Sequence, residues 1–349
     1  MNECAFENNT DLILRLRCPS CFAGQMALSK SEVLCTDCKK TYIIDGDVLD
    51  LRVDPSYDTL LDIDSYDEGH GINVKSSKLI YKAYEKILDK YNANMEGELL
   101  EIASGSGHLT YGLSHFSSFS RINCSDISPE FMRRLSKRVL DDGVCVNTLS
   151  YLFDANSFPF NEGVFDVVAG NSVLHHFANF ENTLADSFRV LKNNGVAIFG
   201  EPVFDTHVFV SLASSLIRSV DERQETRVFS DKEDRVLAAI EGRALLKKSN
   251  LQSDRKNLAM EDKFQFPIAY MRELAAKLGY KQFDCVSPQL NIDFGQMIKK
   301  LIINVFRQNK SDYSKLDEFE YIFDSLNTSY GEPMKEDIRS AFSIFVFVK

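Results

Sequence analysis

Apolar residues in the middle of the chain occur in short runs, and stretches of helical spacing separate these runs. Short apolar runs bounded by turn residues are typical of buried strands. We expect strands at residues 99–102, 121–126, 144–152, 164–170, 196–200, 280–286 and 342–348. Between them, apolar residues such as Phe131, Leu135 and Val139 recur at helical spacing. Strands that alternate with helices predict an α/β fold.

Helical spacing also appears outside this alternation. A helix is expected to begin near Val74, with Tyr84 on its apolar face. Residues from about 205 to 265 and from about 289 to 340 are mostly helical by pattern, and they interrupt the alternation of strands and helices. We interpret them as two helical insertions. Residues 52–73 are rich in aspartate and end in a glycine-containing turn, which predicts a linker.

Four cysteines near the N-terminus form two Cys-x2-Cys pairs separated by 13 residues. Two such pairs complete a tetrahedral zinc site with no open position, which is typical of a structural metal. A redox role is disfavoured because the pair occurs twice and no thioredoxin-like pattern surrounds it. Short strands are expected beside the cysteines, at residues 11–17 and 40–46, and a hairpin is expected to join the second of these to residues 48–51. The predicted zinc ligands are Cys18, Cys21, Cys35 and Cys38.

The strand expected at residues 99–102 continues into a turn of small residues and then into a helix. Glycines in such a turn let backbone N–H groups approach a ligand closely. A dinucleotide fingerprint would need a third glycine where the chain has Thr110. The pattern acid-x-small-x-Gly-x-Gly is present instead, at Glu101, Ala103, Gly105 and Gly107. It resembles motif I of the class I S-adenosylmethionine (SAM) dependent methyltransferases, with Ala103 in place of the motif's first glycine.

Three later positions extend this resemblance. Asp126 ends the next strand, where a fixed carboxylate can accept hydrogen bonds from both ribose hydroxyls of a nucleoside. Asp154 and Ala155, with the Phe-Pro-Phe sequence that follows, are similar to motif III, whose acid binds the adenine amino group. Asn171 and the Leu-His-His sequence after it resemble motif IV, which implies a place near the methyl end of the cofactor.

Together these motifs imply a complete SAM site. The residues expected to bind the cofactor are Glu101, Ala103, Ser104, Gly105, Gly107, Asp126, Ile127, Asp154, Ala155 and Asn171. For Glu101 two roles stay open, namely contact with the amino group of SAM and support of the turn itself. Before the first helix, weaker candidates for contact with the cofactor or substrate are Tyr66, Asp67 and His70, each with a solvated loop as the alternative.

Three further residues are candidates for the reaction itself. His175 and His176 follow the strand at 164–170, and imidazole is a general base near neutral pH. For each histidine, a structural role with hydrogen-bonded partners is the alternative. Glu201 follows the strand at 196–200 and is a candidate for contact with substrate, with a capping or salt-bridge role as the alternative.

The resemblance implies an α/β fold with a seven-stranded Rossmann-like methyltransferase sheet, helical insertions and a small N-terminal zinc ribbon. The expected domains are the zinc ribbon at 1–51, the linker at 52–73 and the methyltransferase domain at 74–349. The expected function is SAM-dependent transfer of a methyl group to an O, N or C nucleophile of a small molecule or specialised metabolite. The alternatives are an RNA base methyltransferase of the zinc-containing rRNA guanine type and a non-catalytic scaffold.

Charge bears on the choice between these functions. The formal net charge is −11, and a nucleic-acid-binding protein usually has a basic face, so a nucleic-acid partner is disfavoured. The rRNA enzymes typically use a mixed Cys/His zinc set, whereas this chain has four cysteines. We find no long apolar run for a membrane span and no secretory signal, so the default expectation is a cytoplasmic protein. The sequence leaves a homo-oligomer open.

Overall fold

The computed structural model describes residues 10–29, 31–56, 63–70, 72–141, 148–251, 261–287, 293–331, 333 and 339–349. Contacts between residues divide the chain into two compact units. Unit 1 comprises Met1–Gly200, Leu274–Asp284 and Phe345–Lys349. Unit 2 comprises Glu201–Glu273 and Cys285–Ile344. Within the described residues, no helix is both long and apolar enough to cross a membrane.

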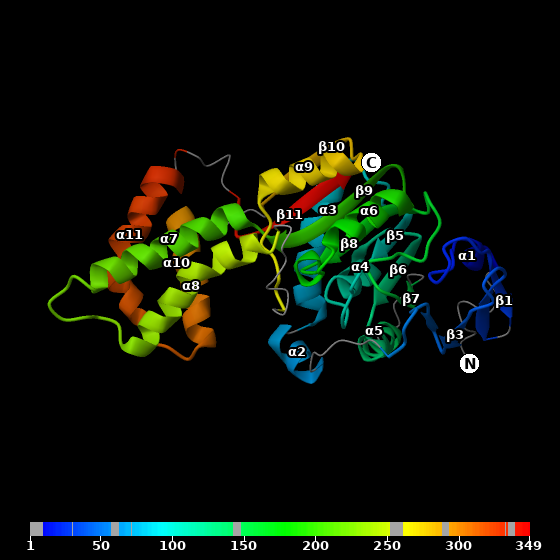
Figure 1. The fold of residues 1–349 in the computed structure, drawn as a ribbon, viewed down its shortest axis with the longest axis horizontal. Helices are drawn as coiled ribbons and strands as arrows, with labels where there is room; N and C mark the ends of the chain where they lie inside the picture. The colour runs from blue at the N-terminus through cyan, green and yellow to red at the C-terminus, as the bar shows by residue number, and fades with distance from the viewer. Residues whose placement is uncertain are drawn as a thin grey trace. The chain divides into compact units, whose positions relative to one another are not determined.

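The central sheet has the seven strands that the sequence predicts (Figure 1). Their bounds are β5 Glu98–Glu101, β6 Arg121–Asp126, β7 Thr148–Leu152, β8 Phe165–Asn171, β9 Leu191–Pro202, β10 Gln282–Val286 and β11 Phe342–Val348. Their order across the sheet is β7-β6-β5-β8-β9-β11-β10. The pairs from β7 to β9 are parallel, so these five strands end at one edge, which we call the carboxyl edge. Residues 144–147 of the third predicted strand lie outside the described part.

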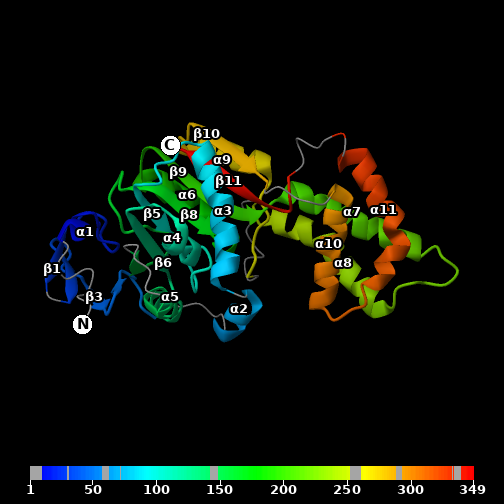
Figure 2. The same cartoon turned by 180° about the vertical axis from the view of Figure 1, so that it is seen from behind.

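Helices cover the two faces of this sheet, which explains why its strands are apolar throughout. Val167, Val168 and Ala169 of β8 are all fully buried, as expected for parallel strands that have no solvated face. Front and back views show α6 and α3 over opposite faces (Figures 1 and 2). The helices around the sheet are α3 Val74–Lys90, α4 Thr110–Phe116, α5 Pro129–Asp141, α6 Phe180–Val190 and α9 Ile268–Leu278.

One predicted boundary is displaced where α6 meets β9. The sequence favours a helix over residues 180–193, closed by Asn194 and Gly195, but α6 ends at Val190 and β9 begins at the next residue. Asn194 has a φ of +63°, and the pairing of β9 with β8 shifts register just before Val196. The Asn-Gly signal therefore marks an irregularity inside the strand and not the end of the helix.

The N-terminal segment extends the same sheet. It contains α1 Thr10–Leu14 and the strands β1 Met26–Ser29, β2 Glu32–Cys35, β3 Thr41–Asp45 and β4 Val48–Asp50. Neighbouring strands from β1 to β4 are antiparallel, and β4 pairs in parallel with β7, so the full sheet has eleven strands. The expected hairpin is confirmed, with Gly46 at a φ of +59° in its turn. We call residues 10–51 the ribbon.

Two expectations for this part of the chain need correction. In place of the strand expected at residues 11–17, the chain forms the helix α1 and then isolated bridges at residues 16 and 17. An ion pair of 2.8 Å between Asp11 and Arg15 supports the helix. The expected linker at 52–73 contains a helix, α2 Ile63–His70. Because β4 pairs with β7, the ribbon belongs to unit 1 and does not form a unit of its own.

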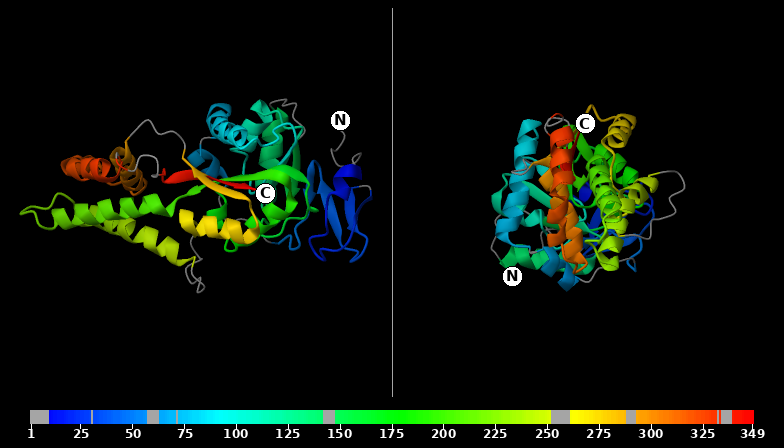
Figure 3. Two further views of the ribbon diagram at one scale, coloured as in Figure 1. Left: turned by 90° about the horizontal axis from the view of Figure 1, so that it is seen from above. Right: turned by 90° about the vertical axis from the view of Figure 1, so that its left-hand side faces the viewer.

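Unit 2 brings the two expected insertions into one helical body. Its longer helices are α7 Phe204–Asp221, α8 Asp231–Ser249, α10 Phe294–Gln308 and α11 Glu320–Leu326. Helices α7 and α8 run side by side (Figure 3), and α10 contacts both. Ala213, Ile217, Ile298, Ile302 and Phe323 are fully buried in a common core. Segments more than forty residues apart in sequence therefore share one hydrophobic cluster.

Candidate functional site

Acidic side chains follow three neighbouring strands at the carboxyl edge. Glu101 ends β5, Asp126 ends β6, and Asp154 comes two residues after the end of β7. Register pairs Glu101 with Cys124 and Asp126 with Leu152, so the three strand ends lie next to one another. The open edge of an α/β sheet is where ligands bind, since the carboxyl ends of its parallel strands converge there. The structure thus brings together the acids that the sequence predicts as a nucleoside site.

The turn after β5 is built from left-handed backbone conformations. Gly105 and Gly107 have φ values of +54° and +98°, which suit glycine. At Gly107 a Cβ atom would also lie 2.3 Å from the Cδ1 atom of Leu135, so a larger residue would have to displace that buried side chain. Ala103 has a φ of +47°, an unfavourable conformation for a residue with a side chain. The alanine that replaces the motif's first glycine is therefore a strained position.

Glu101 is tied to the turn itself. Its side chain is 2% exposed, and one carboxylate oxygen accepts a hydrogen bond of 2.5 Å from the hydroxyl of Thr110 at the start of α4. Burial raises the pKa of Glu101 to about 8; the Thr110 bond acts against this rise and the charge of Asp126 adds to it. Of the two roles that the sequence leaves open for Glu101, this geometry favours support of the turn.

Asp126 is held by backbone groups on both sides. One oxygen accepts from the N–H of Gly105 at 2.9 Å, and the other accepts from the N–H of Ser128 at 3.0 Å. These two bonds fix the position of the carboxylate at the end of β6. The next carbonyl, of Ile127, lies 3.4 Å from a guanidinium nitrogen of Arg52.

Asp154 is exposed at the same edge, and the residues after it are firmly held. Its Oδ1 atom accepts from the backbone N–H of Asn156 at 2.9 Å and from the side-chain amide of the same residue at 2.8 Å. The carbonyl of Ala155 accepts a 2.8 Å hydrogen bond from the hydroxyl of Thr183 on α6. Sequence reasoning missed Thr183, because a threonine within a helix carries no signal of a distant carbonyl partner.

Asn171 is the last residue of β8, and a tyrosine from α3 fixes its surroundings. The hydroxyl of Tyr84 donates to the carbonyl of Gly170 at 2.8 Å and accepts from the N–H of Gly200 at 2.9 Å. It also lies 3.3 Å from Oδ1 of Asn171. Tyr84 therefore joins the ends of β8 and β9. The sequence predicted Tyr84 only as part of the apolar face of the helix. A tyrosine at a buried position, where phenylalanine would pack equally well, is the signal that could have indicated a hydrogen-bond partner for its hydroxyl.

Of the three catalytic candidates, two lie in the turn that follows β8 and one lies in β9. His175 and His176 lie in a short 3-10 turn, Leu174–His176, and their ring centroids are 4.1 Å apart with an interplanar angle of 44°. His175 is buried. Glu201 is fully buried in β9, but contacts assign it to unit 2, whereas the histidines belong to unit 1. Their catalytic roles therefore stay predictions.

Helix α2 is attached to the glycine turn through Asp67. Its carboxylate accepts from Arg134 and Arg138 of α5, each at 3.1 Å, and from the hydroxyl of Ser106 in the turn. Burial acts to raise the pKa of Asp67, but the hydrogen bonds from Ser106 and Arg134 and the charge of Arg138 hold it below its usual value. Tyr66 packs edge-on against Phe131. The side chain of His70 lies outside the described part.

The four predicted cysteines converge in the ribbon. The sulfur atoms of Cys18 and Cys38 are 3.6 Å apart, those of Cys21 and Cys35 are 3.7 Å apart, and all four lie within 4.8 Å of one another. These separations are too long for disulfides, whose sulfurs are about 2.05 Å apart. They match the edge of about 3.8 Å of a tetrahedron whose zinc–sulfur bonds are about 2.3 Å long.

The loop around the cysteines is also shaped for a metal. At Gly24 a Cβ atom would lie 2.1 Å from the sulfur of Cys35, so only glycine fits beside the cluster. Backbone N–H groups of Ala23 and Gly24 donate to Cys21 and lower the pKa of its thiol to about 6. Zinc binds the thiolate form of cysteine, so the surroundings of Cys21 suit the metal.

Comparison with known proteins matches residues 100–199 to a family described as a methyltransferase domain. A protein of Arabidopsis thaliana named "Uncharacterized methyltransferase At2g41040, chloroplastic" is 24% identical over 216 residues, which are 52% of this chain and 60% of that protein. The ubiquinone/menaquinone biosynthesis C-methyltransferase UbiE of Blochmanniella pennsylvanica is 32% identical over 110 residues, which are 30% of this chain and 43% of that protein. The chain thus spans less than two thirds of either relative.

Among solved structures, the YcgJ protein of Bacillus subtilis covers 76% of this chain and 97% of its own, at 13% identity and a TM-score of 0.43. At this TM-score the similarity carries no argument about the fold. The family match is more informative, because residues 100–199 contain the glycine turn and the strand ends that carry Glu101, Asp126, Asp154 and Asn171.

Proposed function

From the premise that residues 100–199 form a class I SAM-dependent methyltransferase domain, we propose that the chain transfers a methyl group from SAM to a small molecule. The accepting atom is an O, N or C nucleophile. The observation that carries this proposal is the set of three acids at adjacent strand ends beside a glycine turn. Such an edge can hold a nucleoside by its hydroxyls and its exocyclic amine.

In this proposal the carboxyl edge holds SAM along its length. Backbone groups of residues 103–107 surround the methionine portion, Asp126 and Ile127 hold the ribose, and Asp154 and Ala155 hold the adenine. Asn171 lies near the methyl end. The residues fit these tasks, since Asp126 is fixed by two backbone N–H groups and the left-handed backbone at Gly105 and Gly107 suits glycine. Glu101 acts indirectly, because its hydrogen bond with Thr110 stabilises the turn that contacts the cofactor.

SAM supplies a methyl group on a sulfonium, which is already an activated leaving group. The protein must mainly align the acceptor with that methyl group and exclude water. A general base is needed only where the acceptor has to lose a proton before or during attack. His175, His176 and Glu201 are the proposed candidates for that task or for contact with the acceptor.

We also propose that Cys18, Cys21, Cys35 and Cys38 hold a structural zinc ion. Binding energy in such small modules is folding energy, so a ligand variant should lose both metal and stability. Elemental analysis should find one zinc per chain, and Cys38→Ser should lower zinc content and soluble yield. Cys285→Ser, which changes a cysteine outside the cluster, is the matched control. Normal folding of the parent chain with no bound zinc would refute this assignment.

Methyl transfer can be tested with SAM labelled in its methyl group and a fractionated extract of the source cells. We expect label in the small-molecule fraction, and we expect Asp126→Ala to abolish it. Label in RNA would replace this function with the RNA base methyltransferase that the N-terminal zinc module also suggests. Absence of label from every fraction, together with no affinity for SAM or S-adenosylhomocysteine (SAH), would indicate a scaffold.

A further inference from the structure

The ribbon is hydrogen-bonded to the segment that follows Asp154. The N–H of Arg17 donates to the carbonyl of Pro159 at 3.2 Å, and the N–H of Asn161 donates to the carbonyl of Arg15 at 2.8 Å. Between these bonds, Leu16 forms an antiparallel bridge with Phe160. The ribbon therefore pairs with this segment through one short antiparallel bridge. This connection is separate from the pairing of β4 with β7.

One side chain secures this junction. The amide nitrogen of Asn161 donates to the carbonyl of Leu14 at 2.9 Å and lies 3.4 Å from the carbonyl of Leu16. Its exposed position means that this amide contributes by its hydrogen bonds and not by packing. A carboxylate of the same shape would have no hydrogen to donate and would face two carbonyl oxygens.

Helix α6 holds the same segment from its other side. The carboxylate of Asp186 accepts from the N–H of Phe158 at 2.6 Å, and Arg189 donates to the carbonyls of Phe158 and Phe160. Asp186 and Arg189 also bond to each other at 2.8 Å. Residues 158–161 are thus clamped between α6 and the ribbon, and they begin only four residues after Asp154.

The ribbon side of this clamp is continuous with the cysteine cluster. Cys18 directly follows Arg17, and its carbonyl accepts from the N–H of Phe22 at 2.9 Å. The guanidinium of Arg17 lies 4.9 Å from the centre of the Phe22 ring. Residues 14–17 therefore connect the cysteine cluster directly to residues 158–161.

We propose that the ribbon positions the adenine-binding segment of the SAM site through the bonds of residues 14–17 to residues 158–161, with Asn161 as a positioning residue. The inference rests on the proposed function, since it takes Asp154 and Ala155 as the adenine contacts. The ribbon then acts on cofactor affinity from a distance, and touches neither the cofactor nor the acceptor.

Asn161→Asp tests this proposal in the full zinc-loaded chain, with Asn193→Asp as the control. Both changes add one negative charge at an exposed asparagine of unit 1, but only Asn161 bonds to the ribbon. We expect Asn161→Asp to weaken SAH binding about fivefold in calorimetric titration, which corresponds to about 1 kcal/mol, and Asn193→Asp to leave it unchanged.

A second ligand separates positioning from general loss of stability. S-inosylhomocysteine has an oxo group in place of the adenine amine, so it lacks the exocyclic N–H that Asp154 is proposed to bind. Both variants should bind it with the affinity of the parent chain. Equal SAH affinities of the two variants, or an equal loss with both ligands, would overturn this inference alone. Absence of SAH binding by the parent chain would overturn the proposed function and the inference with it.

Discussion

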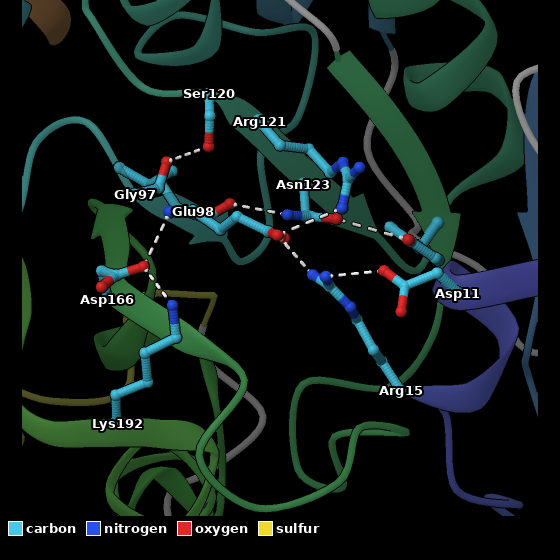
Figure 4. A network of polar contacts seen from close by, with 11 residues as sticks. Asp11, Arg15, Gly97, Glu98, Ser120, Arg121, Asn123, Asp166 and Lys192 are labelled. Carbon is cyan, nitrogen blue, oxygen red and sulfur yellow. Dashed lines mark hydrogen bonds and ion pairs between the residues drawn. The ribbon is translucent and has the colours of Figure 1, made fainter. Parts of the chain in front are cut away.

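The two ends of β5 carry the same type of side chain in opposite surroundings. Glu98, at the start of the strand, bonds to the guanidinium groups of Arg121, at 3.1 Å, and of Arg15 (Figure 4). Glu101, at its end, has no cationic partner in the described part of the chain and accepts from Thr110. One glutamate is neutralised by ion pairs, whereas the other is buried beside a second acid, Asp126.

The same difference extends along both edges of the sheet. At the edge where the strands begin, Asp166 accepts from Lys192 at 2.6 Å and from the N–H of Glu98 at 2.8 Å (Figure 4). It also accepts from the side-chain amide of Asn94 at 2.9 Å. At the carboxyl edge the acids accept from backbone N–H groups and hydroxyls, beside backbone in left-handed conformations. The ion pairs at one edge stabilise the fold, whereas backbone strain and fewer cationic partners mark the edge at which we propose that the cofactor binds.

The largest effect on this comparison is expected from Glu101→Gln. The pKa of Glu101 in the folded chain is about 8, above its ordinary value of 4.5, so the folded state holds a proton that the unfolded state releases between these values. The contribution of Glu101 to stability is therefore present in acid and is lost as pH rises through about 8. Glutamine stays neutral and removes this loss.

Urea unfolding across this pH range measures the effect. Between about pH 5 and pH 9, the variant should gain roughly 2–4 kcal/mol over the parent chain. Glu96→Gln removes an exposed carboxyl near the other end of the strand and should show no comparable gain. If the difference between Glu101→Gln and the parent chain were independent of pH, the contrast between the two ends of β5 would be wrong.

Asp166→Asn should have the next largest effect, in the opposite direction. Burial acts to raise the pKa of Asp166, but the ion pair with Lys192 and the bonds from Glu98 and Asn94 hold it below its usual value. Its contribution is therefore present above the ordinary pKa of aspartate and is lost as pH falls. At neutral pH the variant should lose about 1–3 kcal/mol of unfolding free energy, and the difference should shrink in acid.

Lys192→Met is the matched control for this prediction. Lys192 is 44% exposed, and an exposed ion pair contributes less than about 1 kcal/mol, so its loss should cost less than that of Asp166. Neither variant should alter SAH affinity, because both residues lie at the edge away from the proposed cofactor. A marked loss of SAH binding in Asp166→Asn would show that the two edges are not independent.

The smallest effect is expected from Ala103→Gly. Glycine adopts the φ of +47° at this position without the steric strain that alanine has there, which stabilises the folded state. Glycine also gives the unfolded chain more conformational entropy, which offsets part of this stabilisation. Unfolding free energy should rise by up to about 1 kcal/mol. Ala169→Gly, in the regular and buried β8, should lower it by about 1 kcal/mol instead. Equal signs for the two changes in urea unfolding would contradict strain at Ala103.

The sequence predicted the parts of the molecule that local pattern encodes. Seven apolar runs became seven strands, and Asp126 could be placed at a strand end because side chains after a buried strand reach the edge of the sheet. The cysteine spacing predicted the cluster, since loop geometry brings Cys-x2-Cys pairs together. These features depend on residues close to one another in the chain.

The features that sequence reasoning missed depend on distant contacts. Pairing of Val48 with Ser150 joins the ribbon to the sheet across a hundred residues, and a parallel pair leaves no signal in either segment. Tyr84 was recognised as apolar, but its hydroxyl partners, at Gly170 and Gly200, come from two other strands. The common core of the two insertions likewise depends on packing that neither segment shows alone.

Calorimetric titration of SAH into the parent chain, Asp126→Ala and Glu98→Gln tests the central claim most directly. The claim is that the carboxyl edge of the sheet binds SAM while the opposite edge stabilises the fold. We expect one SAH per parent chain, an affinity at least about a hundredfold weaker in Asp126→Ala, and an unchanged affinity in the less stable Glu98→Gln. Equal affinities of the parent chain and Asp126→Ala, or no binding by the parent chain, would contradict it.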